Sequence, residues 1–189
     1  GITVRVFPGL HTCTWILTDV PADCVEAGHM WLTQAERAQQ PGLGQRIWAI
    51  GGTEEGKVIL DHIRGCAGSL NDGGPLQFLI ETPAGSIFFQ DTTGCWTGVL
   101  EEISADAAIL AAAGRANVDG EPIQGSLAQF IAMETKLLGA RTVVLGHHDD
   151  WMPPVTKAID AAPIRAELVR EVPAARLLEP GYLERVELL

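Results

Sequence analysis

The sequence predicts an α/β fold, with short buried strands alternating with helices in a single domain that covers residues 1–189. Apolar runs at 86–90 and 142–145 are bounded by loop residues and are typical of buried strands. Residues 124–138 carry apolar side chains at helical spacing, which indicates an amphipathic helix packed on a sheet. Residues 76–81 and 86–90, joined by a turn containing Pro83 and Gly85, are typical of a hairpin.

Taken in chain order, the elements alternate. We expect strands at residues 2–7, 12–17, 46–50, 76–81, 86–90, 106–112 and 141–146, with one or two edge strands within 177–189. We expect helices at 33–39, from Thr53 onward, at 96–103, at 124–138 and at 153–172, the last with a break near Ala162–Pro163. Thr53 is a suitable cap because two acidic residues follow it in the first turn. No internal repeat or low-complexity tract interrupts this pattern.

The amino-acid composition and net charge of the chain indicate which classes of binding partner to expect. Apolar residues make up 47% of the chain and charged residues 20%, an excess of apolar surface that points to a large interface or an oligomer. The formal net charge of −11 repels polyanions, so we expect no nucleic-acid partner. No apolar run approaches the roughly 20 residues that span a bilayer. No signal peptide is visible, so we expect a cytoplasmic protein without membrane contact.

The four cysteines, Cys13, Cys24, Cys66 and Cys95, form no Cys-x-x-Cys pair, which argues against a structural zinc site. We expect them to be reduced and partly buried. Cys95 lies at a candidate helix start, where an activated nucleophile is the less favoured interpretation.

Potential metal ligands follow three of the predicted strands. The strand at 141–146 ends in the run His147–Trp151, the strand at 86–90 ends in Asp91, and the strand at 2–7 is followed by His11. Imidazole and carboxylate groups are ligands that zinc, manganese and iron accept. Solvated polar turns are the alternative at each position, and His148 replaces His147 if the register shifts by one. The isolated His29 and His62 are expected to be structural or exposed.

The order and spacing of these motifs resemble the metallo-β-lactamase superfamily, closest to its lactonase-like and phosphodiesterase-like branch. Gln90-Asp91-Thr92-Thr93-Gly94 is similar to the family's Gly-Asp-Thr-Gly type turn, with Gln in place of the usual Gly. His147 is similar to the His of its His-x-Asp type turn. The resemblance implies a four-layer αββα sandwich and a site for two divalent metals, zinc first, with manganese or iron as alternatives.

The resemblance also implies roles for individual residues. His11, Asp91 and His147 would be the metal ligands, with Asp91 bridging the metals and holding the catalytic water. His148 and Asp149 would orient the ligands, although Asp150, like Asp149, is also a suitable helix cap. Arg115 and Trp151 would contact the substrate. The reaction would be hydrolysis of a small ester, lactone, amide or phosphodiester by a metal-bound hydroxide.

The family's His-x-His-x-Asp-His motif is absent from the sequence. Catalytic zinc usually keeps three protein ligands, so the remaining ligands are too few for two metals. The chain therefore resembles the second half of such a fold, and we expect an N-terminal half or a companion chain to complete the site. The competing hypothesis is a non-catalytic subunit that keeps the fold and serves as an interaction or scaffold module.

Overall fold

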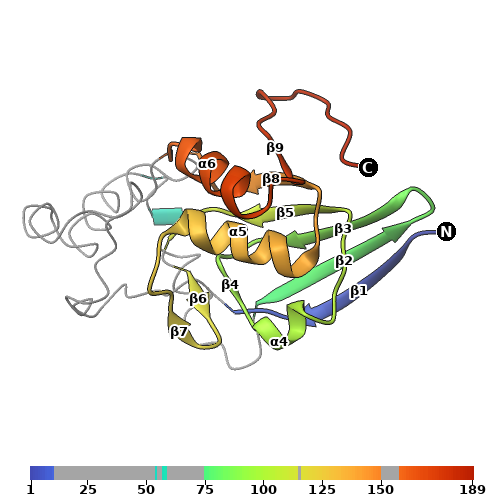
Figure 1. Cartoon of the computed structure of the whole chain (residues 1–189), viewed down its shortest axis with the longest axis horizontal. Helices are drawn as coiled ribbons and strands as arrows, with labels where there is room; N and C mark the ends of the chain where they lie inside the picture. The colour runs from blue at the N-terminus through green and yellow to red at the C-terminus, as the bar shows by residue number, and fades with distance from the viewer. Residues whose placement is uncertain (11–53, 55–56, 59–74, 115, 150–157) are drawn as a thin grey trace, which may run out of the picture.

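The structure, a computed structural model, describes residues 1–10, 54, 57–58, 75–114, 116–149 and 158–189. Its main sheet has six strands in the order β1-β2-β3-β5-β8-β9 (Figure 1). They are β1 (Thr3–Pro8), β2 (Leu76–Thr82), β3 (Gly85–Gln90), β5 (Ala107–Ala111), β8 (Thr142–Gly146) and β9 (Arg176–Leu178). These strands confirm the sequence predictions for the same regions.

Five of the six strands run in one direction. β2 pairs antiparallel with both β1 and β3, whereas β5, β8 and β9 continue the sheet in parallel with β3. The carboxyl ends of β1, β3, β5 and β8 therefore meet at one edge of the sheet, which we call the carboxyl edge. Pro8, Gln90, Ala111 and Gly146 are the last strand residues there.

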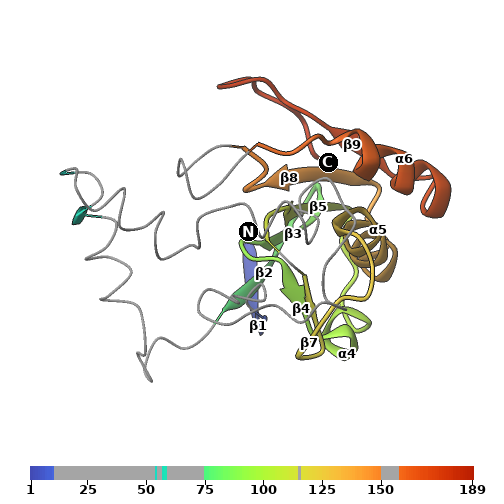
Figure 2. The same ribbon diagram turned by 90° about the vertical axis from the view of Figure 1, so that its left-hand side faces the viewer.

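Helices α5 (Leu127–Leu138) and α6 (Ala162–Glu171) pack together on one face of the sheet (Figure 2). Helix α5 begins in a capping box: the Ser126 hydroxyl accepts from the Gln129 amide, and the Gln129 side chain accepts from the Ser126 amide. It ends at Gly139, whose φ of 66° is the left-handed conformation that glycine adopts without steric cost. The amphipathic helix predicted at 124–138 is confirmed.

The face of the sheet beneath the helices forms the core. Alternate strand residues and the facing helix residues share one buried cluster, including Leu79, Phe88, Leu110, Val143, Phe130, Ile131, Ile164 and Leu168. Burying each such side chain contributes roughly 1.5–3 kcal/mol, so this layer holds α5 and α6 against the sheet.

The opposite face, which we call the outer face, is also apolar. One row of registered residues crosses all six strands there: Val6, Phe78, Phe89, Ile109, Val144 and Leu178. None of the six is fully buried, and Val6 is 54% exposed, as is Val4 in the next row at 53%. No helix in the described part of the chain packs over this row. The sheet is thus apolar on both faces, which is typical of a sheet with a second layer on each side.

A smaller sheet of three strands, in the order β4-β6-β7, was not predicted. It consists of β4 (Gly94–Cys95), β6 (Asn117–Val118) and β7 (Glu121–Pro122), next to the short helix α4 (Thr97–Leu100). Asp119 and Gly120 join β6 to β7 with φ of 55° and 94°, as two-residue hairpin turns require. The Asp119 carboxylate accepts from the Thr97 amide and hydroxyl, both at 2.8 Å, and so fixes α4 to the hairpin.

Two predicted helices need correction. Of the helix expected at 153–172, only residues from 158 onward are described: residues 158–161 are not helical and α6 begins at Ala162, because Pro163 lies in the first turn of this helix and does not break a longer one. Helix α4 is shorter than the predicted 96–103. The strands expected at 12–17 and 46–50 and the helix at 33–39 lie outside the described residues. In the ranges that are described, no helix is long and apolar enough to cross a membrane.

Candidate functional site at the carboxyl edge

Asp91 and His147 meet at the carboxyl edge. His147 Nε2 lies 3.0 Å from Asp91 Oδ1, although β5 separates the strands that these residues follow. Two strand spacings amount to about 10 Å, so the two side chains bridge the end of β5 to reach each other. The Asp91 side chain is 65% exposed and the His147 side chain 35% exposed. The pair is therefore reachable from solvent.

The backbone of His147 is unusual. Its φ is 52°, in the left-handed region that non-glycine residues adopt only at a cost. The change of direction occurs at the first residue after β8, where the sheet holds Gly146 in register with Ala111. Such outliers concentrate at functional sites, because the surrounding structure must hold them in place.

The chemistry and spacing of this pair fit part of a metal shell. Two ligands about 2.1 Å from a tetrahedral zinc ion lie about 3.4 Å apart, close to the observed 3.0 Å. A carboxylate and an imidazole are also ligands that zinc accepts. Across the described ranges, no group of three or more His, Cys, Asp or Glu side chains could hold a metal ion. The pair thus offers two ligand atoms, and a complete site needs more.

His11 lies outside the described residues, but the end of its strand is described. The Gly9 amide donates to Pro75 O at 2.8 Å, which fixes the chain where it leaves β1. A Cβ on Gly9 would lie 3.1 Å from Gln77 Cγ, so the backbone approaches the β2 side chain closely. The residues that lead to His11 therefore sit at the carboxyl edge, two strands from β3.

The other predicted site residues either make no side-chain contact within the described ranges that would assign them a role, or lie outside those ranges. His148 is half-buried and its carbonyl accepts from the Ile159 amide at 2.9 Å, whereas Asp149 is exposed. Neither side chain makes a hydrogen bond or ion pair with the described part of the chain, so their orienting role stays a prediction. Arg115, Asp150 and Trp151 lie outside the described residues, as do His29 and His62.

A buried polar layer beneath Asp91 was missed from the sequence. The Gln90 side-chain amide donates to Thr92 O at 2.6 Å and to Gly94 O at 3.2 Å, closing the turn that carries Asp91. Gln77 on β2 donates to Gly94 O and to Gln90 Oε1, each at 3.1 Å. Both glutamines are almost fully buried. The one signal in the sequence was Gln90 itself, which stands where the family has Gly.

Thr93 fixes the same turn to the neighbouring strand. Its hydroxyl lies 2.5 Å from Ala113 O and accepts from the Ala113 amide at 3.2 Å. Thr93, like Gln90, is 1% exposed, whereas Asp91 between them is open to solvent. The turn is thus held from below, while its carboxylate stays accessible from solvent.

Glu134 on α5 completes the buried layer. Neither carboxylate oxygen makes a hydrogen bond of normal geometry, although the Gln90 amide and the Cys95 thiol lie close enough to favour the charged form. Burial outweighs these neighbours and raises the pKa of Glu134 to about 8. The group is therefore mainly protonated at neutral pH.

The interpretation of Cys95 as an activated nucleophile is wrong. The thiol is fully buried in the core. Burial raises its pKa far above the ordinary range, and the nearby Glu134 raises it further. A thiol that stays protonated and inaccessible does not attack a substrate.

No protein-family model matches the sequence, and no curated protein matches it. Two solved structures are similar to part of the chain. One is Igni18, a novel metallo hydrolase from the hyperthermophilic archaeon Ignicoccus hospitalis KIN4/I, with 21% identity and a TM-score of 0.42 over 60% of this chain and 46% of that chain. The other, from Thermotoga maritima, is assigned to the Zn-dependent hydrolases of the metallo-β-lactamase superfamily, with 13% identity and a TM-score of 0.34 over 48% of this chain and 44% of that chain.

The chain spans about half the length of each of these structures. Both likenesses are distant and partial. In structure, part of this chain is similar to metallo-hydrolases, one of them of the metallo-β-lactamase superfamily.

Proposed function

We propose that this chain is part of a metal-dependent hydrolase, with Asp91 and His147 as metal ligands and His11 as a third. The observation that carries the proposal is the 3.0 Å approach of Asp91 to His147 at the carboxyl edge. When bound, divalent metal, zinc first, would act as a Lewis acid on the substrate and lower the pKa of a water molecule. A small ester, lactone, amide or phosphodiester fits this chemistry.

The contribution of the chain itself is to position the ligands. Gln90 and Thr93 fix the Asp91 turn from beneath, so the carboxylate keeps its place without needing the metal to order it. The direct contact with Asp91 holds the imidazole of His147 in one orientation. We assign Asp91 the additional role of holding the attacking water, because among the described residues only its Oδ1 contacts His147 and its side chain is 65% exposed.

We further propose that a second sheet completes both the fold and the site. The row from Val6 to Leu178 gives the outer face an apolar surface across all six strands. Along β3, the side chains of Ile87 and Phe89 share this face, and the alternation places Asp91 on the same side. A sheet packed on the outer face would therefore reach the carboxyl edge, where it could supply the missing ligands. This arrangement is the four-layer sandwich that the family resemblance implies.

The outer face also favours a second candidate function. A subunit that serves only as a scaffold needs the same apolar surface but no metal. In that case Asp91 and His147 would form a simple hydrogen bond, which a neutral imidazole can donate through Nε2.

A metal-binding series separates the two candidates. The full-length product of the gene that encodes this chain should bind zinc, measured by elemental analysis after dialysis, and should hydrolyse ester or phosphodiester test substrates. Asp91→Asn and His147→Asn should each lower zinc occupancy and activity at least tenfold, whereas Glu102→Gln, at an exposed site with no proposed role, should keep both. A metal-free but folded full-length protein would instead support the scaffold.

A further inference from the structure

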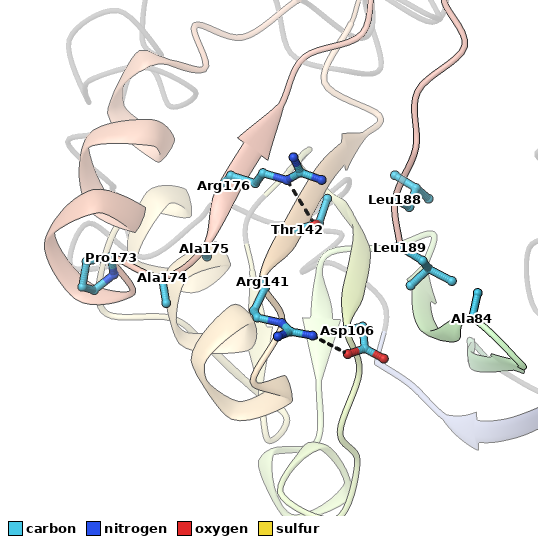
Figure 3. A pocket seen from close by; sticks show the side chains of 10 residues that line it. All are labelled: Ala84, Asp106, Arg141, Thr142, Pro173, Ala174, Ala175, Arg176, Leu188 and Leu189. Carbon is cyan, nitrogen blue, oxygen red and sulfur yellow. Dashed lines mark hydrogen bonds and ion pairs between the residues drawn. The ribbon is translucent and has the colours of Figure 1, made fainter.

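One cavity in the described part of the chain lies away from the carboxyl edge. A cavity of about 460 Å³ lies at the opposite end of the sheet (Figure 3). Its lining comes from the starts of β8 and β9, the loop before β5, and the end of the chain: Ala84, Asp106, Arg141, Thr142, Pro173, Ala174, Ala175, Arg176, Leu188 and Leu189. The length of β8, about 16 Å, separates it from His147. The cavity is thus distinct from the proposed metal site.

One guanidinium of this cavity is held by a carboxylate. Arg141 Nη2 donates to Asp106 Oδ1 at 2.9 Å. The other oxygen of Asp106 accepts from the Ser86 amide at 3.0 Å and from the Ser86 hydroxyl at 3.2 Å. The Ser86 amide and then the Arg141 guanidinium hold the pKa of Asp106 below its usual value, so it stays charged. Arg141 is therefore oriented, and its charge is balanced.

The second guanidinium has no such balance. Arg176 Nε donates to Thr142 Oγ1 at 3.4 Å, and Thr142 is itself buried. The two terminal nitrogens of Arg176 contact no hydrogen-bonding or acidic group among the described residues. By contrast, the two arginines of α6 pair with carboxylates, Arg165 with Glu179 and Arg170 with Glu167 and Glu171. The chain has a net charge of −11, yet this guanidinium at the wall of a cavity has no acidic partner among the described residues.

We propose that this cavity binds a small oxyanion, a carboxylate or a phosphate, through the free fork of Arg176. The planar guanidinium presents two parallel N–H donors that match the two oxygens of such a group. Arg141 adds donors from the same wall, since only its Nη2 is used by Asp106. Figure 3 shows Arg176, Thr142 and Arg141 along one side and Leu188 and Leu189 along the other. An anion with a short apolar part therefore fits better than a bare ion.

Titration of the protein with inorganic phosphate, and separately with acetate and with butyrate, tests the proposal. Binding is followed by calorimetry and by the melting temperature, against sodium chloride at equal ionic strength. We expect at least one oxyanion to raise the melting temperature, and butyrate to bind more tightly than acetate. If phosphate alone binds, the ligand class is a phosphate; if only the carboxylates bind, it is an organic acid. Failure of all three to bind would overturn the proposal.

Three variants localise the effect. Arg176→Gln should weaken the anion at least tenfold, and Arg176→Lys should also weaken it, because an ammonium keeps the charge but loses the fork. Arg185 carries the same charge in the same C-terminal segment but does not line the cavity. The Arg185→Gln variant should therefore bind the anion as the wild type does. Equal binding by wild type and Arg176→Gln, or an equal loss in Arg185→Gln, would contradict the assigned site. None of these results depends on zinc or on hydrolysis.

Discussion

His147 Nε2 and Asp91 Oδ1 lie 3.0 Å apart although they follow strands that are not neighbours in the sheet. Only the ends of β3 and β8 are free to approach each other, because β5 pairs with both strands along their length. The parallel direction of β3, β5 and β8 is therefore what brings the two side chains together.

Zinc should stabilise the protein through this pair. A ligand that binds only the folded state at 100 times its dissociation constant adds about 2.7 kcal/mol to the free energy of unfolding. We expect urea denaturation of the full-length protein to shift accordingly when zinc is added, and to shift back with chelator. Asp91→Asn should abolish most of the shift, whereas Glu187→Gln, at an exposed site with no proposed role, should retain it. An equal shift in both variants would place the zinc elsewhere.

Glu134 should make stability fall as pH rises. The folded protein holds the proton up to about pH 8, whereas the unfolded chain releases it near its ordinary value of 4.5. Between these values each pH unit removes about 1.4 kcal/mol from the free energy of unfolding. Glu134→Gln lacks this loss, so its stability relative to the wild type should rise from pH 5 to pH 8. Urea denaturation at both values measures the difference, and Glu102→Gln, at an exposed site, should show no such trend.

Replacing Gln90 should lower zinc affinity more than replacing Gln77. Gln90→Leu removes the hydrogen bonds to Thr92 O at 2.6 Å and to Gly94 O at 3.2 Å, and each such bond contributes about 0.5–1.5 kcal/mol. Gln77→Leu loses a bond to Gly94 O but spares Thr92. We expect both variants to lose stability in urea, and only Gln90→Leu to lower zinc affinity markedly. Similar zinc affinity in both would show that the turn is held without Gln90.

The outer face should be required for association with a partner and dispensable for the stability of this chain. Val6 is 54% exposed, so Val6→Lys should change the free energy of unfolding of this chain by less than about 0.5 kcal/mol. It should nevertheless weaken binding to a separately produced companion half or subunit, measured by calorimetry or sedimentation. Leu183→Lys, at an exposed apolar residue away from the strands, is the matched control. An unaffected complex with Val6→Lys would exclude this face as the interface.

The sequence was sufficient for most of the main sheet because its strands are short apolar or alternating runs bounded by loop residues. The hairpin of β6 and β7 escaped prediction because its strands have only two residues each, although Asp119-Gly120 is a strong turn signal. Pro163 was misinterpreted because a proline in the first turn and one inside a helix look alike when no cap marks the start.

In the candidate site, too, some residues could be predicted from the sequence and others could not. Asp91 and His147 could be predicted as candidate ligands because a polar group at the end of an apolar strand contrasts with its surroundings. Gln77, Gln90 and Glu134 could not, because polar residues in a strand or helix are usually assigned to the exposed face. Only the register of β2 with β3, and the position of α5 above them, bring these three groups into one buried layer.

The left-handed backbone at His147 means that the candidate site and the stability of the fold have opposing requirements. Glycine would adopt a φ of 52° there without strain, so His147→Gly would relieve the backbone while removing the imidazole. A random search for more heat-resistant versions of this protein would therefore tend to erase the histidine. Such a search would need a simultaneous screen for zinc binding to keep it.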